Sequence, residues 1–310
     1  MRLATFKFKD QKRTGFTAAG LDGKFYDITD LFTAVSADVI SLIEGGNTVL
    51  AELNDLARGI TGDESRAEGL LNVLDAEFRP PIEKPGKIVC LAGNYRAHIT
   101  ESGYVDPAPR SRFTQQLFLK PSTALLGDGG VIELGGQNVK VGWETELAVV
   151  IGKRGRNISE ENAYDHVFGY TILNDLSERG LNSQIEDRHS REMDGFCDWL
   201  AGKWFDGFAP CGPWIVTKDE IGDPHDLEIR FYLNGELRQK GNTRDMIFTI
   251  PEQVAYISTI MTLEPGDIIS TGTPAGAGLG DSSTSLADGD VIVSEIEGVG
   301  KLANKVRWID

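Results

Sequence analysis

Apolar and polar residues alternate over many short stretches of the chain, a spacing that predicts strands. The apolar run Leu147–Ile151 is too short for a helix and contains β-branched residues, so it predicts a buried strand, as does Lys87–Ala92. Leu227–Arg238 predicts a hairpin because Asn234-Gly235 lies at its centre. Long helices such as Thr249–Met261 are few, so we predict an α+β fold that is mostly β, with mixed strand pairing.

A proline-rich stretch divides the chain into two predicted units. Residues 1–80 predict a small N-terminal α+β domain, in which Leu3–Phe8 alternates as a strand and Asp38 can cap a helix. Arg79–Lys87, which reads RPPIEKPGK, predicts a linker. Residues 81–310 then form the larger domain and contain every candidate for catalysis. We expect the N-terminal domain to pack on the larger one or to contribute to a dimer.

Three acidic residues form the main candidate for a functional site. Glu144 and Glu146, in the stretch GWETELAVVIG, are two positions apart on a predicted strand and therefore point to one face. Asp175 ends the alternating stretch VFGYTILND. Any one of these acids alone is better interpreted as an exposed residue of an acidic protein, but their combination favours a bound cation. Carboxylates without Cys or His indicate Mg²⁺ or Mn²⁺ rather than Zn²⁺.

His98 and Glu101 are three positions apart in a short predicted helix and so share a face. A carboxylate beside an imidazole fixes its tautomer and strengthens it as a general base. For an isolated pair, however, an exposed ion pair is the more common explanation. The segment Tyr104–Arg112, which follows this helix, is expected to be an irregular lid or loop.

Lys203 is a lone cation in the aromatic and glycine-rich stretch WLAGKWFDGFAP. It is either a surface residue whose stem packs on apolar neighbours or a desolvated cation that stabilises a developing oxyanion. The flanking Gly202 and Gly207 suggest close approach of the backbone and favour the second interpretation.

Composition limits the classes of partner. The net charge of −16 argues against nucleic acids and anionic membranes, although it permits an anionic substrate where a metal and local cations reverse the field. The three cysteines, Cys90, Cys197 and Cys211, are widely spaced, so reduced thiols are expected. The sequence shows neither a signal peptide nor an apolar run long enough to span a membrane, and we predict a cytoplasmic protein.

Seven motifs in order, from about Lys87 to Trp308, are similar to those of the fumarylacetoacetate hydrolase superfamily, in its acylpyruvate hydrolase and oxaloacetate decarboxylase-like branch. They are GNYRAH, FLKP, WETELAVVIG, NDLSER, GKWFDGFAPCGP, NGELRQ and TGTPAGAG. The resemblance implies a mixed β-sandwich roll, a homodimer, and Mg²⁺ or Mn²⁺ bound by Glu144, Glu146 and Asp175.

The resemblance also implies roles for other residues. His98 and Glu101 match a catalytic dyad on a mobile lid, and Lys203 matches a catalytic lysine. Four residues are expected to bind substrate: Tyr95, Arg179, Asn182 and Thr273. The segment Ser177–Ile185, which contains two of them, is expected to be helical.

Three positions depart from the family pattern. Gly180 replaces the aspartate that follows Arg179 in relatives, and Trp204 replaces a small residue. Asn182 replaces a glutamine that orients the attacking water in relatives that cleave acylpyruvates, which places the water-positioning step in doubt.

Together these features predict a metal-dependent hydrolase that cleaves a C–C bond in a 2-oxo or 2,4-dioxo acid. Decarboxylation of an oxaloacetate-like acid is an alternative because it needs no attacking water. Isomerase, hydratase or sugar-acid lyase activity on the same scaffold is another, since fold alone does not determine the reaction. A non-catalytic binding module is the least favoured hypothesis, because the three acids, the dyad and the lysine are all retained.

Overall fold

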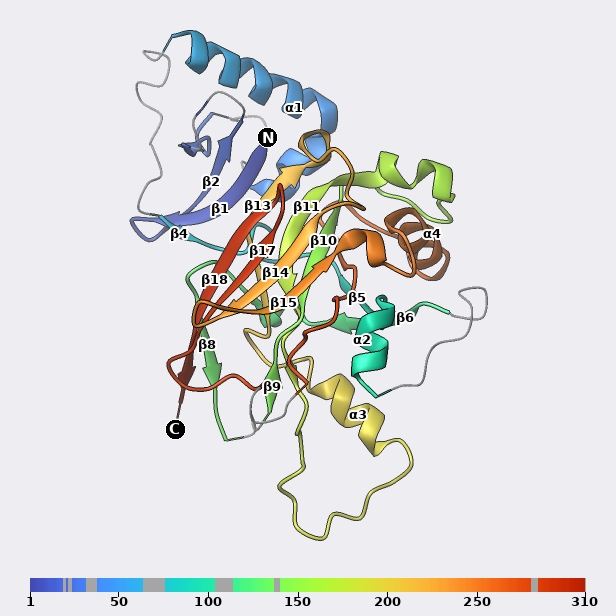
Figure 1. Cartoon of the computed structure of the whole chain (residues 1–310). Coiled ribbons are helices and arrows are strands. Elements are labelled where there is room, and N and C mark those ends of the chain that lie inside the picture. Colours follow the sequence, from blue (N-terminus) through green and yellow to red (C-terminus); the bar gives the residue numbers. More distant parts are fainter. Residues whose placement is uncertain are drawn as a thin grey trace.

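The computed structural model describes residues 1–18, 21, 24–31, 38–63, 76–103, 114–136, 140–279 and 284–309. Within these ranges, two large β-sheets and a two-stranded ribbon make up most of the regular structure, with four α-helices around them (Figure 1). The fold is α+β and mostly β, so this prediction is confirmed. The predicted lid, Tyr104–Arg112, lies outside the described residues.

The larger sheet has eleven strands among the described residues, and its central strands support the candidate acids. Its main path runs β3-β2-β1-β13-β11-β10-β16-β5-β6, with β4 beside β1 and β7 beside β13. Most neighbours are antiparallel, but β16 and β5 are parallel, as are β7 and β13, so the pairing is mixed as predicted. The bounds are β1 Arg2–Phe8, β2 Gln11–Thr17, β3 Tyr26–Asp27, β4 Glu77–Phe78, β5 Ile88–Ala92, β6 Gln116–Lys120, β7 Leu125–Leu126, β10 Thr145–Ile151, β11 Val167–Asn174, β13 Ala209–Thr217 and β16 Ile268–Ser270.

The smaller sheet has five strands in the order β15-β14-β17-β18-β8 and packs against the larger one. The ribbon pairs β9 with β12 and lies beside the candidate acids. The bounds are β8 Val131–Leu134, β9 Val141–Gly142, β12 Ser177–Glu178, β14 Glu228–Leu233, β15 Glu236–Asn242, β17 Val291–Ile296 and β18 Gly300–Trp308.

The helices lie at the edges of this two-sheet arrangement. Figure 1 shows α1 over the N-terminal strands at the top, and α3 with its preceding loop projecting at the bottom. The bounds are α1 Val39–Gly62, α2 Arg96–Glu101, α3 Asp194–Ala201 and α4 Ile250–Ile260, with 3₁₀ turns at Ser122–Ala124, Glu160–His166, Lys218–Glu220 and Thr243–Asp245.

Strand β10 is buried along its whole length, and its two faces have different surroundings. The odd-numbered residues of Leu147–Ile151 pack into the core between the two sheets, where Ile229 of β14 meets them. On the opposite face, Ala148 packs in a cluster that includes residues of α3. Because side chains alternate along a strand, Glu144 and Glu146 project toward this second face, away from the smaller sheet.

The N-terminal strands extend the larger sheet. Strand β1 pairs with β13 in a register that places Leu3 opposite Ile215, and the cluster under α1 includes Val150 and Phe168 of the central strands. The N-terminal segment is therefore joined to the central strands by backbone hydrogen bonds and by apolar packing. The proposed division into domains at residue 80 stays a prediction.

The helix predicted over Ser177–Ile185 is wrong. Strand β12 ends at Glu178, and turns follow it up to α3. The buried Glu178 carboxylate accepts hydrogen bonds from the backbone N–H groups of Lys140 and Gly180, which holds the chain in a turn. Asn182 then has a φ of 62°, in the left-handed region that an α-helix excludes. By contrast, the predicted strands β5 and β10, the β14–β15 hairpin and α4 are confirmed.

Helix α4 begins with a capping box formed by Thr249 and Glu252, and substitution of Thr249 tests this local structure. The Glu252 carboxylate accepts hydrogen bonds from the backbone N–H and the hydroxyl of Thr249, at 2.8 and 2.7 Å. Thr249→Ala should lower the free energy of unfolding by about 1 kcal/mol in urea denaturation, whereas Thr249→Ser should retain it. Equal stability of the two variants would contradict a stabilising cap.

Candidate metal centre and active site

The three predicted acids meet in one buried cluster. Glu144, Glu146 and Asp175 each contribute a carboxylate oxygen, and these three atoms lie within 4.8 Å of one another. Strand register explains why: Thr145 of β10 pairs with Asn174 of β11, which places Asp175 opposite Glu144. The backbone N–H of Asp175 donates to the Glu144 carbonyl at 2.8 Å, so the pairing continues past the end of β11.

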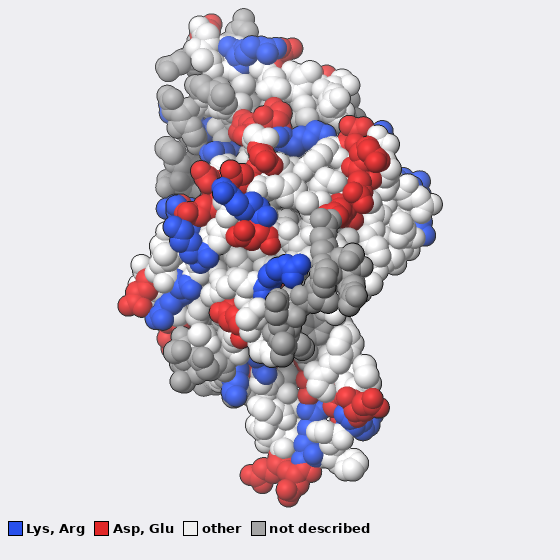
Figure 2. All heavy atoms as spheres, turned by 45° about the vertical axis from the view of Figure 1, so that its right-hand side comes forward, with Lys and Arg blue, Asp and Glu red and all other residues white. Residues whose placement is uncertain are grey.

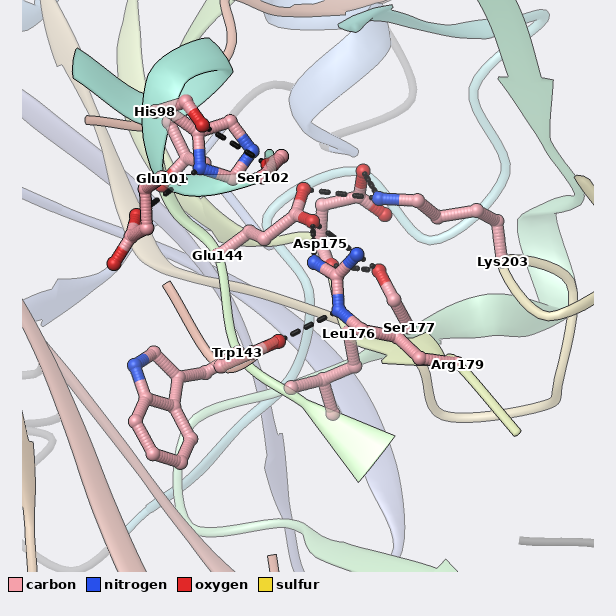
Figure 3. Close-up of polar contacts among 12 residues, drawn as sticks. His98, Glu101, Ser102, Trp143, Glu144, Asp175, Leu176, Ser177, Arg179 and Lys203 are labelled. Carbon is pink, nitrogen blue, oxygen red and sulfur yellow. Dashed lines mark hydrogen bonds and ion pairs between the residues drawn. The ribbon is translucent and has the colours of Figure 1, made fainter. Parts of the chain in front are cut away.

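Two buried lysines contact the acids. Lys203, which follows α3, donates to Glu144 Oε2 at 2.9 Å and to Asp175 Oδ2 at 2.7 Å (Figure 3). Lys120, at the end of β6, donates to Asp175 Oδ1 at 2.6 Å and to the Leu176 carbonyl at 3.1 Å. Both oxygens of Asp175 therefore have an ammonium partner.

The surroundings of Lys203 resolve the two interpretations of its sequence context. Its side chain is 2% exposed, and its Nζ lies 5.2 Å and 5.8 Å from the ring centroids of Phe118 and Trp199. Burial lowers the pKa of Lys203, but attraction to Asp175 and Glu144 outweighs that effect and leaves the pKa raised. Lys203 is thus a desolvated cation at the acid cluster and not a surface residue.

Arg179 connects the acid cluster to the glycine-rich turn after β16. Its guanidinium forms an ion pair with Glu144 Oε1, and its Nε donates to the Gly278 carbonyl at 2.6 Å (Figure 3). Burial raises the pKa of Glu144, but Lys203 and Arg179 outweigh it and lower the pKa to about 2. Glu144 is therefore ionised throughout the physiological range.

Glu146 has a different environment. Among the described residues it forms no ion pair, and its Oε2 accepts hydrogen bonds only from Ser270 Oγ at 2.5 Å and the Gly272 N–H at 2.9 Å. Burial, followed by repulsion from Asp175 and Glu144, raises the pKa of Glu146 well above its usual value. Glu146 is thus a buried carboxylate beside two other carboxylates, and its negative charge is not compensated by an ion pair among the described residues.

A divalent cation fits this arrangement. The cluster presents oxygen ligands, which Mg²⁺ and Mn²⁺ prefer, from three directions. Such an ion would also neutralise Glu146, which forms no ion pair with a lysine or arginine among the described residues and whose pKa the nearby Lys203 lowers too little to offset the repulsion. The residues that would hold the ion are therefore the three that the sequence predicts.

The predicted dyad lies on α2, beside the acid cluster (Figure 3). His98 Nδ1 is 3.5 Å from Glu101 Oε2, and the imidazole contributes to lowering the pKa of Glu144. Both Glu101 oxygens also accept the Gly276 N–H at 3.0 Å. These bonds attach α2 to the same glycine-rich turn that Arg179 contacts.

Two predicted substrate-binding residues lie in the core next to the cluster. Tyr95 is buried, and among the described residues its hydroxyl has no hydrogen-bond partner. Burial and then Glu146 raise the pKa of Tyr95 well above its usual value, so the phenol stays neutral. The Thr273 hydroxyl donates to the Thr145 carbonyl at 3.0 Å and accepts from Gln239. Among the described residues, the Tyr95 hydroxyl therefore still has a proton to donate. The Thr273 hydroxyl already donates its proton to the Thr145 carbonyl.

The side chain of Asn182 contacts helix α3 instead of the acid cluster. Its side-chain amide donates to Asp198 Oδ1 of α3 at 2.8 Å, and Arg188 forms an ion pair with the same carboxylate. Trp204, the other unusual residue, has its ring half exposed while its Nε1 donates to the Leu119 carbonyl at 2.9 Å. Sequence spacing does not reveal either contact.

Sequence reasoning did not assign a role to Lys120. The residue stands in the quoted FLKP motif, but a lysine is normally exposed. Its place in that motif is the signal that the sequence offers for it. Ser270 and Gly272 have no assigned role in the sequence either, because their contacts with Glu146 depend on how β16 packs beside β10.

The family model described as "Fumarylacetoacetate (FAA) hydrolase C-terminal" matches residues 87–307. The chain belongs to the fumarylacetoacetate hydrolase family. This match covers the larger sheet's central strands, the smaller sheet and every residue of the acid cluster. The family contains enzymes, and the acid cluster of this member fits a divalent metal.

Several curated members of the family are similar to this chain. An uncharacterised protein of Pyrococcus abyssi is 46% identical over 223 residues, which are 72% of this chain and 91% of that protein. The oxaloacetate tautomerase YisK of Bacillus subtilis is 37% identical over 276 residues, 88% of this chain and 87% of that one. The human mitochondrial oxaloacetate tautomerase FAHD2A is 39% identical over 233 residues, 75% of this chain and 70% of that one.

Solved structures resemble the whole chain. Maleylpyruvate hydrolase from Sphingobium sp. SYK-6 matches with a TM-score of 0.74 and 34% identity over 100% of both chains. A complex of that enzyme with manganese (II) ion and pyruvate matches with a TM-score of 0.73 and 33% identity, also over 100% of both chains. A family member thus binds a divalent ion together with a 2-oxo acid. No helix in the described parts of this chain is long and apolar enough to cross a membrane.

Metal binding should depend on pH through Glu146. Because its pKa is raised, a proton competes with the metal, and affinity should fall as the pH is lowered from 8 toward 5, with protons released on binding. Calorimetry with Mn²⁺ in two buffers of different ionisation enthalpy measures both effects. In Glu146→Gln, binding should weaken and proton release should disappear. An affinity independent of pH would contradict this assignment.

Proposed function

We propose that this protein is a divalent-metal-dependent enzyme that interconverts the keto and enol forms of a small 2-oxo dicarboxylic acid of the oxaloacetate type. The acid cluster, the dyad and the buried lysines supply a metal site, a base and hydrogen-bond donors, which proton transfer next to a carbonyl requires. The observation that favours this reaction over hydrolysis is the engagement of Asn182 by Asp198.

Charge balance supports a substrate with two negative charges. Three cationic side chains lie against the acid cluster, and their ion pairs are with Glu144 and Asp175. The cations are Lys120, Lys203 and Arg179. A divalent ion adds two positive charges, which a dicarboxylate would neutralise in this largely desolvated site.

When bound, the metal supplies a Lewis acid that draws electrons from the 2-oxo carbonyl and so acidifies the adjacent C–H. Glu144, Glu146 and Asp175 would hold it, and Lys120 orients Asp175 from the other side. Tyr95, whose hydroxyl lacks a partner within the described residues, offers a further donor to the bound acid.

His98 is the base in this scheme. Its imidazole lies beside Glu144, is oriented by Glu101, and removes a proton from C3 of the substrate. The negative charge that develops on the 2-oxo oxygen faces the Lys203 ammonium, which donates a hydrogen bond to it. Return of this proton from the His98 imidazolium to that oxygen gives the enol and restores the neutral imidazole, and the reverse sequence gives the ketone. No C–C bond breaks, and no water is consumed.

Hydrolysis would need a water held for attack on the distal carbonyl. In relatives that cleave acylpyruvates a glutamine at position 182 has that task, but here the side chain is one methylene shorter and its amide donates to Asp198. The names of the oxaloacetate tautomerases among the relatives support the same choice.

C–C hydrolysis of a 2,4-dioxo acid is the second candidate. It is supported by the likeness of the entire chain to maleylpyruvate hydrolase. The first steps would be shared, because both reactions develop charge on the same 2-oxo oxygen. Decarboxylation of oxaloacetate would share them as well and would release CO₂.

We further propose that the enzyme is a cytoplasmic homodimer whose partner is a small-molecule oxo acid rather than nucleic acid or membrane. On the face shown in Figure 2, lysine and arginine side chains are interspersed with aspartate and glutamate. This distribution, like the net charge of −16, does not favour a polyanion.

The function is tested by following the enol form of oxaloacetate spectroscopically with Mn²⁺ present. Wild-type protein should accelerate its conversion to the ketone, and His98→Ala should reduce kcat by about 10²- to 10⁴-fold because the base is lost. Lys203→Met should reduce kcat by about 10²- to 10³-fold. His189→Ala, in the exposed loop before α3, is the matched control and should retain activity.

Product analysis separates the candidates. Release of two carboxylic acids from maleylpyruvate, with no acceleration of oxaloacetate tautomerisation, would establish hydrolysis instead. Release of CO₂ and pyruvate from oxaloacetate would establish decarboxylation. Normal turnover by both variants, His98→Ala and Lys203→Met, would remove the proposed mechanism altogether.

A further inference from the structure

At the end that carries the two glutamates, β10 lacks a strand partner on one side among the described residues. Strand β16 pairs with β10 from Val150 to Ala148 and ends at Ser270. Beyond that point the backbone N–H and C=O of Thr145, which lies between the two glutamates, point toward a side where no strand of the described residues continues the pairing. Backbone groups in such a buried position require other partners.

Two side chains supply these partners in a closed ring of hydrogen bonds. The Thr145 N–H donates to Gln239 Oε1 at 3.1 Å, and Gln239 Nε2 donates to Thr273 Oγ1 at 2.7 Å. Thr273 Oγ1 in turn donates to the Thr145 carbonyl at 3.0 Å. The second N–H of Gln239 donates to the Pro274 carbonyl at 2.7 Å. The Gln239 amide therefore joins the glutamate strand to the turn after β16.

Gln239 is unusual in its own strand. Strand β15 is otherwise exposed or half-buried, yet Gln239 is 1% exposed. A β-bulge explains this: Phe231 pairs with Gln239 and Tyr232 pairs with Leu237, so Arg238 is the extra residue. Bulges redirect side chains, and this one directs an amide from the smaller sheet toward the larger one.

The two peptide groups held by the ring are those next to the metal ligands. The Thr145 N–H belongs to the peptide that links Glu144 to Thr145, and the Thr145 carbonyl belongs to the peptide that links Thr145 to Glu146. Rotation of either peptide plane would swing the adjoining carboxylate. The Thr145 hydroxyl is also fixed, 2.9 Å from Ser294 Oγ of β17.

We propose that Gln239 is a positioning residue of the metal centre, which sets the direction of Glu144 and Glu146 through Thr145. The proposal rests on the divalent-metal site of the proposed function, but not on the identity of the reaction. The hydrogen bonds of Gln239 go to Thr145, Thr273 and Pro274 and not to the carboxylates of the metal ligands. Its effect should therefore appear in the binding of the metal alone.

The test compares Gln239→Met with Gln253→Met, using Mn²⁺ as the probe. Gln253 is a matched control because it is also fully buried and donates to a backbone carbonyl, that of Phe248 at 2.8 Å, but has no hydrogen bond to the glutamate strand. Gln239→Met should weaken Mn²⁺ binding by about 10- to 100-fold in calorimetry, the usual effect of losing an outer partner. The electron paramagnetic resonance spectrum of bound Mn²⁺ should also change. Gln253→Met should reproduce wild-type affinity and spectrum.

Thr273→Val removes two other hydrogen bonds of the same ring. It keeps the test valid if Gln239→Met fails to fold. It should change Mn²⁺ affinity and spectrum in the same direction, with no substrate present. Wild-type affinity and spectrum in a folded Gln239→Met or Thr273→Val protein would overturn the proposal. Equal losses in Gln253→Met would also overturn it, because they would reflect stability alone. Absence of Mn²⁺ binding by wild-type protein would overturn the metal centre itself, and this proposal with it.

Discussion

Repulsion among three buried carboxylates is the constraint on which the rest of this structure depends. Glu144, Glu146 and Asp175 are forced together by strand register, in an interior where like charges interact strongly. The protein offsets the repulsion unevenly. Cations contact Glu144 and Asp175, whereas the hydrogen-bond donors to Glu146 among the described residues are neutral. Because of that asymmetry, a metal ion would offset the charge of Glu146 most. The ion is therefore part of the charge balance of the folded protein.

The two sheets divide this task between them. The larger sheet brings the acids together through backbone pairing, and its strand β6 supplies Lys120 and the Phe118 ring beside Lys203. The smaller sheet contributes no carboxylate to the cluster, but it holds the glutamate strand from behind through Ser294 and Gln239. Rigid strands rather than loops therefore fix the ligands, as precise coordination requires.

Much of this arrangement follows from sequence patterns, and the reasons are local. The alternation around Glu144 and Glu146 fixes which residues share a face, and the end of an alternating run locates Asp175. Local pattern fails where tertiary contacts decide the outcome. The segment after Glu178 has helical spacing, but a buried carboxylate and a left-handed Asn182 hold it in turns. Lys120 and Gln239 are polar residues in strands, and only the packing of other elements shows that they are buried.

The position of Lys203 has a consequence for how the site is anchored in the fold. This lysine follows α3 directly, and α3 is preceded by an exposed loop that projects from the molecule (Figure 1). Asp198 of α3 receives both Asn182 and Arg188 from the segment before it. The strands therefore fix the three carboxylates, whereas α3 and the segment before it fix the Lys203 ammonium, so that this charge and the metal ligands are anchored by separate parts of the chain.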